Sequence, residues 1–83
     1  MHTRIEDWKN SWFGIQLGLS ASEIEKLIAN LKELLQDHDQ HFHLTSTYEG
    51  SGGVGDIEIY LKDDTELDNM KVSSRAYAPG EEV

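Results

Sequence analysis

Three of the four histidines lie in one short acidic segment, where they form the densest group of potential metal ligands. The group consists of His38, Asp39, His41 and His43. His41 and His43 are two residues apart, so on a strand both rings would point to one face, and Asp56 or Glu58 from a neighbouring strand would supply a third ligand. The same spacing suits a cross-strand hydrogen-bonding pair, and neither a helical His-x-x-x-His motif nor a cysteine supports a metal. We therefore expect a hydrogen-bonding pair and no bound metal or other cofactor.

Catalysis by a nucleophile has little support in the residues. Ser46, His43 and Asp56 can be assembled into a triad only by choosing three common residue types, and the chain has no Gly-x-Ser-x-Gly motif to hold a serine on a nucleophile elbow. The adjacent carboxylates of Asp63 and Asp64 lie in an expected turn, where solvation is the ordinary state. We expect no enzyme.

The segment 50–55, Gly-Ser-Gly-Gly-Val-Gly, is the best candidate for anion binding, because successive unhindered N–H groups can form a nest around a phosphate. It lacks the Lys-Ser/Thr ending of a P-loop and precedes an expected strand, so it equally suits a plain hairpin loop. The lysines and arginine that could neutralise a phosphate in this half are Lys62, Lys71 and Arg75. Aromatic side chains that could stack on a base are Trp8, Trp12, Tyr48, Tyr60 and Tyr77.

Alternating runs and one apolar stripe predict the elements that position these residues. Residues 13–19 alternate apolar side chains with glycine and glutamine, which predicts a strand buried on one face. Ser20 and Glu23 have the spacing of a capping box, and a helix with a continuous apolar stripe follows them. The stripe consists of Ile24, Leu27, Ile28, Leu31, Leu34 and Leu35. We expect it to cover one face of a sheet.

Residues 41–48 and 54–61 also alternate, and their glycine-bearing connection predicts an antiparallel hairpin. A register that matches the two apolar faces contains the pairs Leu44–Ile59, Phe42–Leu61, His43–Tyr60 and Thr45–Glu58. A last edge strand is expected within residues 70–77.

Together these elements predict a small two-layer α+β domain of order β-α-β-β-β. One long helix covers one face of an antiparallel sheet of three to four strands. The 83 residues are enough for one domain with a marginal core. We expect an N-terminal arm at 1–11, the α+β core at 12–78 and an acidic tail at 79–83.

Charge and hydropathy exclude several classes of protein. Sixteen acidic against seven basic residues give a net charge of -9, which would repel a nucleic-acid backbone. No stretch approaches about 18 apolar residues, so we expect no membrane span. The lack of cysteine and of a secretory signal is typical of a cytoplasmic protein.

The face of the sheet away from the helix has two interpretations. It would combine glycines with imidazole, phenol and carboxylate groups, which suits either simple solvation or a platform for a ligand or a second copy. A homodimer is expected on the second interpretation, because dimerisation enlarges the core of a small domain.

Four segments together carry a resemblance to known proteins. They are residues 12–20 (Trp-Phe-Gly-Ile-Gln-Leu-Gly-Leu-Ser), 41–44 (His-Phe-His-Leu), 52–60 (Gly-Gly-Val-Gly-Asp-Ile-Glu-Ile-Tyr) and 68–70 (Asp-Asn-Met). The combination resembles small α+β immunity proteins of polymorphic toxins. More pointedly, it resembles compact dimeric phage anti-defence proteins that sequester the cyclic ADP-ribose signals of Thoeris immunity.

The second resemblance implies a non-enzymatic viral sponge, a homodimer in the host cytoplasm that holds a nucleotide second messenger. The candidate ligand-binding residues are then Trp12, His41, His43, Tyr48, Gly52, Gly53, Tyr60, Lys62 and Arg75. The net charge opposes an anionic ligand unless the site is locally basic.

The alternative is an immunity or inhibitor protein that neutralises a basic toxin through an acidic surface. Its expected contact residues are Asp56, Glu58, Asp63, Asp64, Glu66 and Asp68.

Overall fold

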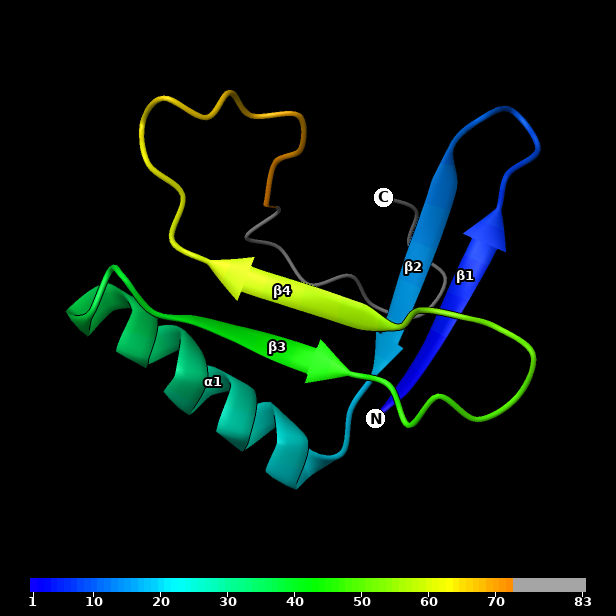
Figure 1. Cartoon of the computed structure of the whole chain (residues 1–83), viewed down its shortest axis with the longest axis horizontal. Helices are drawn as coiled ribbons and strands as arrows, with labels where there is room; N and C mark the ends of the chain where they lie inside the picture. The colour runs from blue at the N-terminus through cyan, green and yellow to red at the C-terminus, as the bar shows by residue number, and fades with distance from the viewer. Residues whose placement is uncertain (73–83) are drawn as a thin grey trace.

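The computed structural model describes residues 1–72, which form four strands and one helix in the order β-β-α-β-β (Figure 1). The elements are β1 (His2–Asp7), β2 (Phe13–Gly18), α1 (Ala21–Gln36), β3 (His41–Thr45) and β4 (Asp56–Tyr60). β1 pairs with β2 and β3 pairs with β4, both antiparallel, in two separate two-stranded sheets. The α+β class is confirmed. The single sheet of three to four strands in β-α-β-β-β order is wrong.

The first hairpin includes β1, which lies in the segment 1–11 predicted to be an N-terminal arm. The ladder between β1 and β2 sets Ile5 opposite Ile15. At the turn, the Asp7 carboxylate accepts a hydrogen bond of 2.8 Å from the backbone N–H of Lys9, whose φ is 58°. Pattern reasoning misses β1 because a strand with one large apolar residue shows no alternation, and its stability depends on the ladder with β2.

Gly14 in β2 is explained by a close approach within the chain. A Cβ at this position would lie 3.1 Å from two indole atoms of Trp8. The bare face of β2 at Gly14 is therefore occupied by this indole ring.

The helix begins at the expected position because its start signal, the capping box, is local. The Ser20 hydroxyl accepts a hydrogen bond from the backbone N–H of Glu23 at 3.2 Å, and the Glu23 carboxylate accepts one from the N–H of Ser20 at 2.9 Å. This reciprocal pair confirms the capping box. Beyond Gln36, Asp37 leaves the helical conformation with φ of -134°.

The second hairpin has the expected faces but a different register. Phe42 pairs with Ile59 and Leu44 with Ile57, so the predicted register is wrong by two residues. The error keeps each side chain on its predicted face, because side chains alternate with a period of two. A backbone hydrogen bond of 2.9 Å from the N–H of Ser46 to the carbonyl of Gly55 continues this pairing towards the loop. At the other end β4 stops at Tyr60, so Leu61 lies beyond the ladder.

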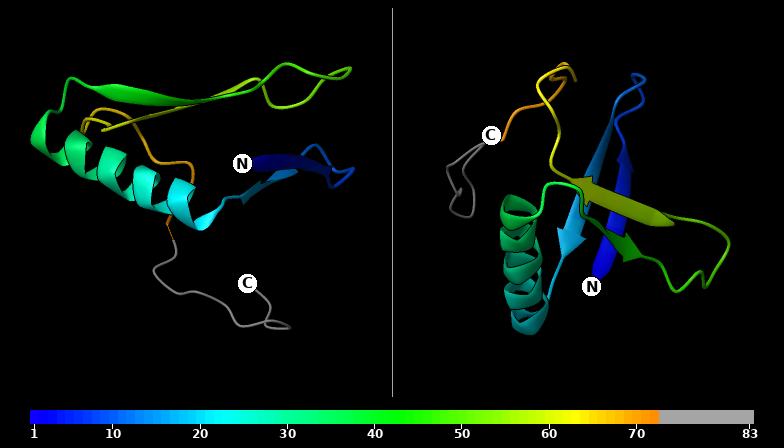
Figure 2. Two further views of the ribbon diagram at one scale, coloured as in Figure 1. Left: turned by 90° about the horizontal axis from the view of Figure 1, so that it is seen from below. Right: turned by 60° about the vertical axis from the view of Figure 1, so that its left-hand side comes forward.

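The helix and the second hairpin lie side by side, and the first hairpin projects away from them (Figure 2). Along β3 and β4 the apolar residues are half-buried and the residues between them are exposed. The less exposed line of α1 contains Leu27, Asn30 and Leu34. The core therefore lies between α1 and one face of the β3–β4 sheet.

This core is thin. Among residues 1–72 only Leu34 is buried, with 6% of its surface exposed. The other members of the predicted apolar stripe are split: Leu27 is half-buried, whereas Ile24, Ile28, Leu31 and Leu35 are exposed. The expectation that the whole stripe covers a sheet is wrong, because a sheet of two short strands is too narrow to cover it.

Two expected segments fall at the end of the chain. Met70–Val72 are not part of a strand. The rest of the expected edge strand and the acidic tail lie outside the described residues. Within the described part, the helix is too short and too polar to cross a membrane.

The burial of Leu34 makes a direct test of this packing. We expect Leu34→Ala to lower the free energy of unfolding by about 2 kcal/mol, at the lower end of the range for a buried leucine because the site is close to solvent. Leu35→Ala is the matched control: Leu35 is 70% exposed, so its loss should cost less than about 0.5 kcal/mol. Urea denaturation followed by circular dichroism measures both, and equal costs would contradict this orientation of α1.

Candidate functional site

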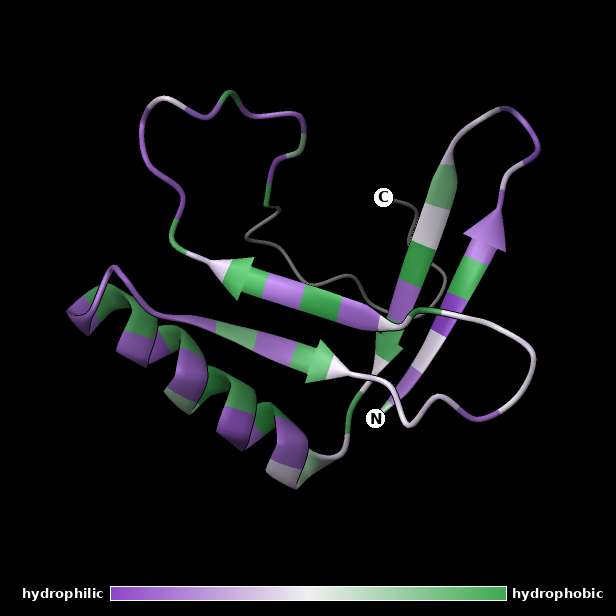
Figure 3. Ribbon diagram, viewed as in Figure 1, coloured by the Kyte–Doolittle hydropathy of each residue, from purple (hydrophilic) through white to green (hydrophobic). Residues whose placement is uncertain are grey.

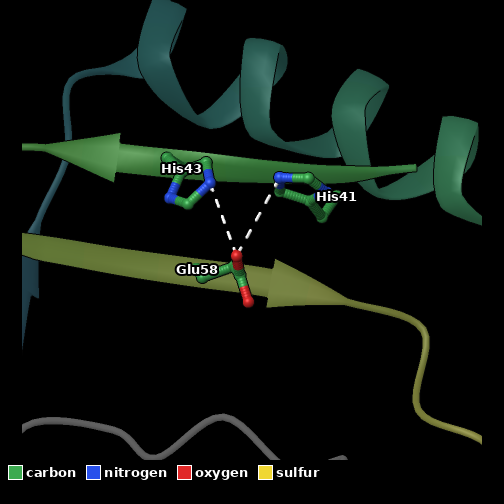
Figure 4. A group of neighbouring side chains, drawn as sticks. All are labelled: His41, His43 and Glu58. Carbon is green, nitrogen blue, oxygen red and sulfur yellow. Dashed lines mark ion pairs between the residues drawn. The ribbon is translucent and has the colours of Figure 1, made fainter. Parts of the chain in front are cut away.

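The outer face of the β3–β4 sheet gathers two histidines and two carboxylates. His43 lies directly opposite Glu58 in the ladder, and Thr45 opposite Asp56. His41 and His43 project from β3 towards Glu58 on β4 (Figure 4). The predicted pairs His43–Tyr60 and Thr45–Glu58 are wrong, since the two-residue change of register brings Glu58 to His43 instead.

Asp56 and Glu58 contact different nitrogens of the histidines. The Oδ2 atom of Asp56 lies 2.8 Å from Nδ1 of His43, and the Thr45 hydroxyl donates to Oδ1 of the same carboxylate at 3.3 Å. The Oε1 atom of Glu58 lies 3.5 Å from Nε2 of His43 and 3.9 Å from Nε2 of His41. The two imidazole rings meet edge to face with their centroids 5.0 Å apart.

Tyr60 and Lys62 belong to a separate group at the end of β4. The Tyr60 hydroxyl donates a hydrogen bond to Glu66, and this bond, with the nearby negative charge, raises the pKa of the phenol above its usual value. The Lys62 ammonium lies 3.4 Å from Asp68 and donates to the carbonyl of Glu66 at 3.1 Å. The charge of Lys62 is thus already paired with an acid of its own loop.

A hydrogen-bonded turn organises the start of the same loop. Thr65 donates to the Asp63 carboxylate from its hydroxyl and from its backbone N–H, and these bonds lower the pKa of Asp63. Asp63 therefore serves the local fold of the turn.

A cleft of about 690 Å³ lies between the start of β1, α1, the end of β3 and the glycine segment, and its apolar lining includes Leu27, Leu44 and Ile57. Gly52 and Gly53 line it, and Gly53 has φ of 147°, a conformation that favours glycine. Its cationic groups include Lys26 and the N-terminal ammonium, and its acidic residues are Glu23 and Glu49. The positive charge that a phosphate would require is therefore largely balanced within the cleft.

Glu23 links the cleft to the helix cap. Its carboxylate accepts a hydrogen bond of 2.6 Å from the N-terminal ammonium of Met1. That bond, together with those from Ser20, lowers the pKa of Glu23 from 4.5 to about 2.

The described chain does not bring the candidate ligand residues around one site. His43, Gly52 and Gly53 line the cleft, while Tyr60, the last residue of β4, and Lys62, in the loop that follows, line a separate hollow. Trp12 and Tyr48 are about equally exposed, at 71% and 70%, and neither lines the cleft. His41 projects, like His43, from the outer face of the sheet. Arg75 lies outside the described residues.

Sequence reasoning missed the residues that β1 contributes to the cleft, namely His2, Thr3 and Ile5. It also missed the pairing of Glu66 with Tyr60. A tyrosine followed six residues later by a glutamate is no recognisable motif, so only the folded loop reveals the contact.

Hydrophobic residues recur along α1 and the strands (Figure 3), and many of the large ones are exposed. On α1 the exposed helix stripe, defined as Ile24, Ile28, Leu31 and Leu35, has residues between 42% and 70% exposed. On the first hairpin Phe13, Ile15 and Leu17 are between 43% and 59% exposed. Exposed apolar groups gathered in this way are typical of interaction surfaces.

No protein-family model, curated protein or solved structure matches this chain. Its functional assignment therefore depends on the chemistry of the surfaces described above.

The lowered pKa of Glu23 predicts an acid-dependent loss of stability. The pKa of Glu23 is about 2 in the folded protein, against an ordinary value of 4.5. The stabilisation by the charged carboxylate is therefore complete above pH 4.5 and is lost as the pH falls through about 2. Glu23→Gln keeps a side chain suited to the capping box but removes the charge, so the decline in stability over this range should become smaller. The measurement is urea denaturation at a series of pH values.

Glu25→Gln is the matched control, because Glu25 is an exposed glutamate of the same helix outside the cap. A Glu23→Gln profile that coincides with those of the wild type and the control would contradict the role given to this carboxylate.

Proposed function

We propose that this protein is a non-enzymatic inhibitor that binds a basic protein through the exposed helix stripe, with its acidic charge steering the encounter. The observation that carries this proposal is the exposed helix stripe on a chain of charge -9. The proposal agrees with the immunity-protein alternative in the class of protein, but it assigns the contact to the helix instead of the acidic residues of 56–68.

The stripe has the geometry of a helix that docks in a groove. Its four residues follow the i, i+4, i+7, i+11 spacing, which places them on one side of α1. At 100° per residue the stripe lies about a quarter of a turn around the helix from the line that contains Leu34. The helix can therefore keep Leu34 against the β3–β4 sheet while the stripe contacts another molecule.

Charge favours a basic partner over a second copy. Two chains that each carry -9 repel one another on approach, whereas a basic surface is attracted and associates faster. The acids of the loop after β4 are partly engaged within the chain, since Glu66 bonds Tyr60 and Asp68 pairs with Lys62. Their contribution to binding is then long-range attraction more than direct contact.

Substitutions on opposite sides of α1 test the proposal. We expect a partner of basic isoelectric point to be captured from lysate by the wild type and by Ala29→Asp, but at least tenfold less by Ile28→Asp. Both variants add one negative charge to an exposed helix position, and only Ile28 belongs to the stripe. Capture should also weaken as salt is added.

Two results would overturn the proposal. One is equal capture of the same protein by both variants. The other is a wild-type homodimer, seen by analytical ultracentrifugation, that Ile28→Asp separates into monomers, because the stripe would then be covered by a second copy.

The nucleotide sponge is a second candidate, and the cleft is the observation that favours it. Its volume of about 690 Å³ lies within the range of small-molecule pockets, and unhindered glycines line one side. Little positive charge in the cleft is left unpaired, so a second copy of the chain would have to supply further cationic groups to bind the phosphates. The pairing of Lys62 with Asp68 weighs against this candidate.

Calorimetric titration with cyclic ADP-ribose isomers tests the sponge. If the cleft holds such a nucleotide, Lys26→Gln should weaken binding at least tenfold, because Lys26 lines the cleft. Lys32→Gln removes the same charge from a helix position that does not line the cleft and should leave affinity unchanged. The absence of binding heat with the wild type removes this candidate.

A further inference from the structure

We propose that the outer face of the β3–β4 sheet is a binding site for a divalent transition-metal ion of the zinc type. Its ligands are Nε2 of His41, Nε2 of His43 and the carboxylate of Glu58 (Figure 4). The site is independent of the proposed inhibitor function. The expected cross-strand hydrogen bond is present between His43 and Asp56, and the proposed site adds a metal to it.

The Glu58 carboxylate lies at ion-pair distance from both imidazole nitrogens, a spacing that also suits three ligands of one metal ion. The Glu58 oxygen lies 3.5 Å from one imidazole nitrogen and 3.9 Å from the other, beyond the usual 2.7–3.2 Å of an N–H···O bond. Ligands bound tetrahedrally to zinc at 2.0–2.1 Å are about 3.3 Å apart. All three ligand atoms already lie within 4.8 Å of one another, so small side-chain rotations would bring them to that spacing.

Asp56 gives His43 the orientation that a metal ligand needs. Its carboxylate lies 2.8 Å from Nδ1, so Nδ1 carries the proton of the neutral ring and Nε2 presents its lone pair. A carboxylate behind a ligating histidine is the usual outer support of a protein zinc site. The Thr45 hydroxyl donates a long hydrogen bond of 3.3 Å to the other oxygen of Asp56, a second contact to the supporting group.

The strands hold these groups on a common face. His43 and Glu58 are directly opposed in the ladder, and His41 is two residues from His43, so the pleat points all three to the same side. Their side chains are between 40% and 54% exposed. An ion bound there has three protein ligands and a fourth position open to water or to a group from another molecule.

The composition of the ligand set identifies the class of ion. Imidazole nitrogen suits zinc, copper, nickel and iron, whereas magnesium and calcium prefer sites made only of oxygen. Glu58 and Asp56 supply negative charge, and the chain as a whole attracts cations. A divalent ion would then be held by charge and by two nitrogen ligands at once.

Titration with Zn²⁺, and with Co²⁺ as its spectroscopic substitute, tests the site. We expect one Zn²⁺ per chain by calorimetry and a visible Co²⁺ spectrum typical of four-coordinate cobalt. His41→Ala, His43→Ala and Glu58→Gln should each weaken Zn²⁺ binding at least tenfold. Asp56→Asn leaves the three ligands in place and should weaken it about 10- to 100-fold.

Two histidines outside the site serve as matched controls. His38 lies at the end of α1, where its ring nitrogen is 3.2 Å from the carbonyl of Leu35, and His2 is in β1. His38→Ala and His2→Ala should leave Zn²⁺ affinity unchanged. Circular dichroism without metal establishes that every variant retains the wild-type fold.

The proposal fails if folded His41→Ala and Glu58→Gln bind Zn²⁺ as tightly as the wild type. It also fails if His2→Ala abolishes binding, because the ion would then be held near the N-terminus. Since the titration contains no protein partner, its result is separate from that of the inhibitor proposal.

Discussion

The packing of α1 against one face of a two-stranded sheet is the constraint on which the rest of this structure depends. A hairpin of two short strands is at best marginally stable in water, so β3 and β4 need the helix beside their half-buried apolar face, although Leu44 and Ile57 of that face also line the cleft. The sheet is narrow, and it in turn covers only the line of α1 that contains Leu34. One interaction therefore explains both the existence of a core and the large apolar surface that remains exposed beside it.

The parts of the fold that are visible in the sequence are those with local causes. The capping box and the apolar periodicity act within α1, so the helix could be placed closely. Alternation assigned the correct faces to β3 and β4, but any shift of register by an even number of residues preserves those faces. The observed register, which continues through the Ser46–Gly55 bond, therefore could not be distinguished from the predicted one by the pattern. β1 was missed because its cause lies in β2 and not in its own pattern.

The same register decides the chemistry of the candidate site. The sequence indicated His41 and His43, with either Asp56 or Glu58 as a partner. It could not indicate how the two acids divide their roles, because that depends on which residue faces His43 across the ladder. With Glu58 opposite His43, Asp56 is free to support Nδ1 while Glu58 lies between the two Nε2 atoms. A slip of two residues would have put Tyr60 opposite His43 and moved Glu58 one pair away, opposite Thr45.

The pleat of β3 and β4 also separates the two proposed activities. Residues of even number on β3 are half-buried on one face, and residues of odd number project to the opposite, exposed face, where the histidines lie. A protein docked on the exposed helix stripe therefore contacts the helix side of the molecule and leaves the proposed ion accessible. Because Phe42 and Leu44 alternate with His41 and His43, movement of β3 against α1 would displace the ligands as well. Rigidity of the thin core is thus a condition for the metal site, whereas docking on the stripe requires only that α1 remain helical.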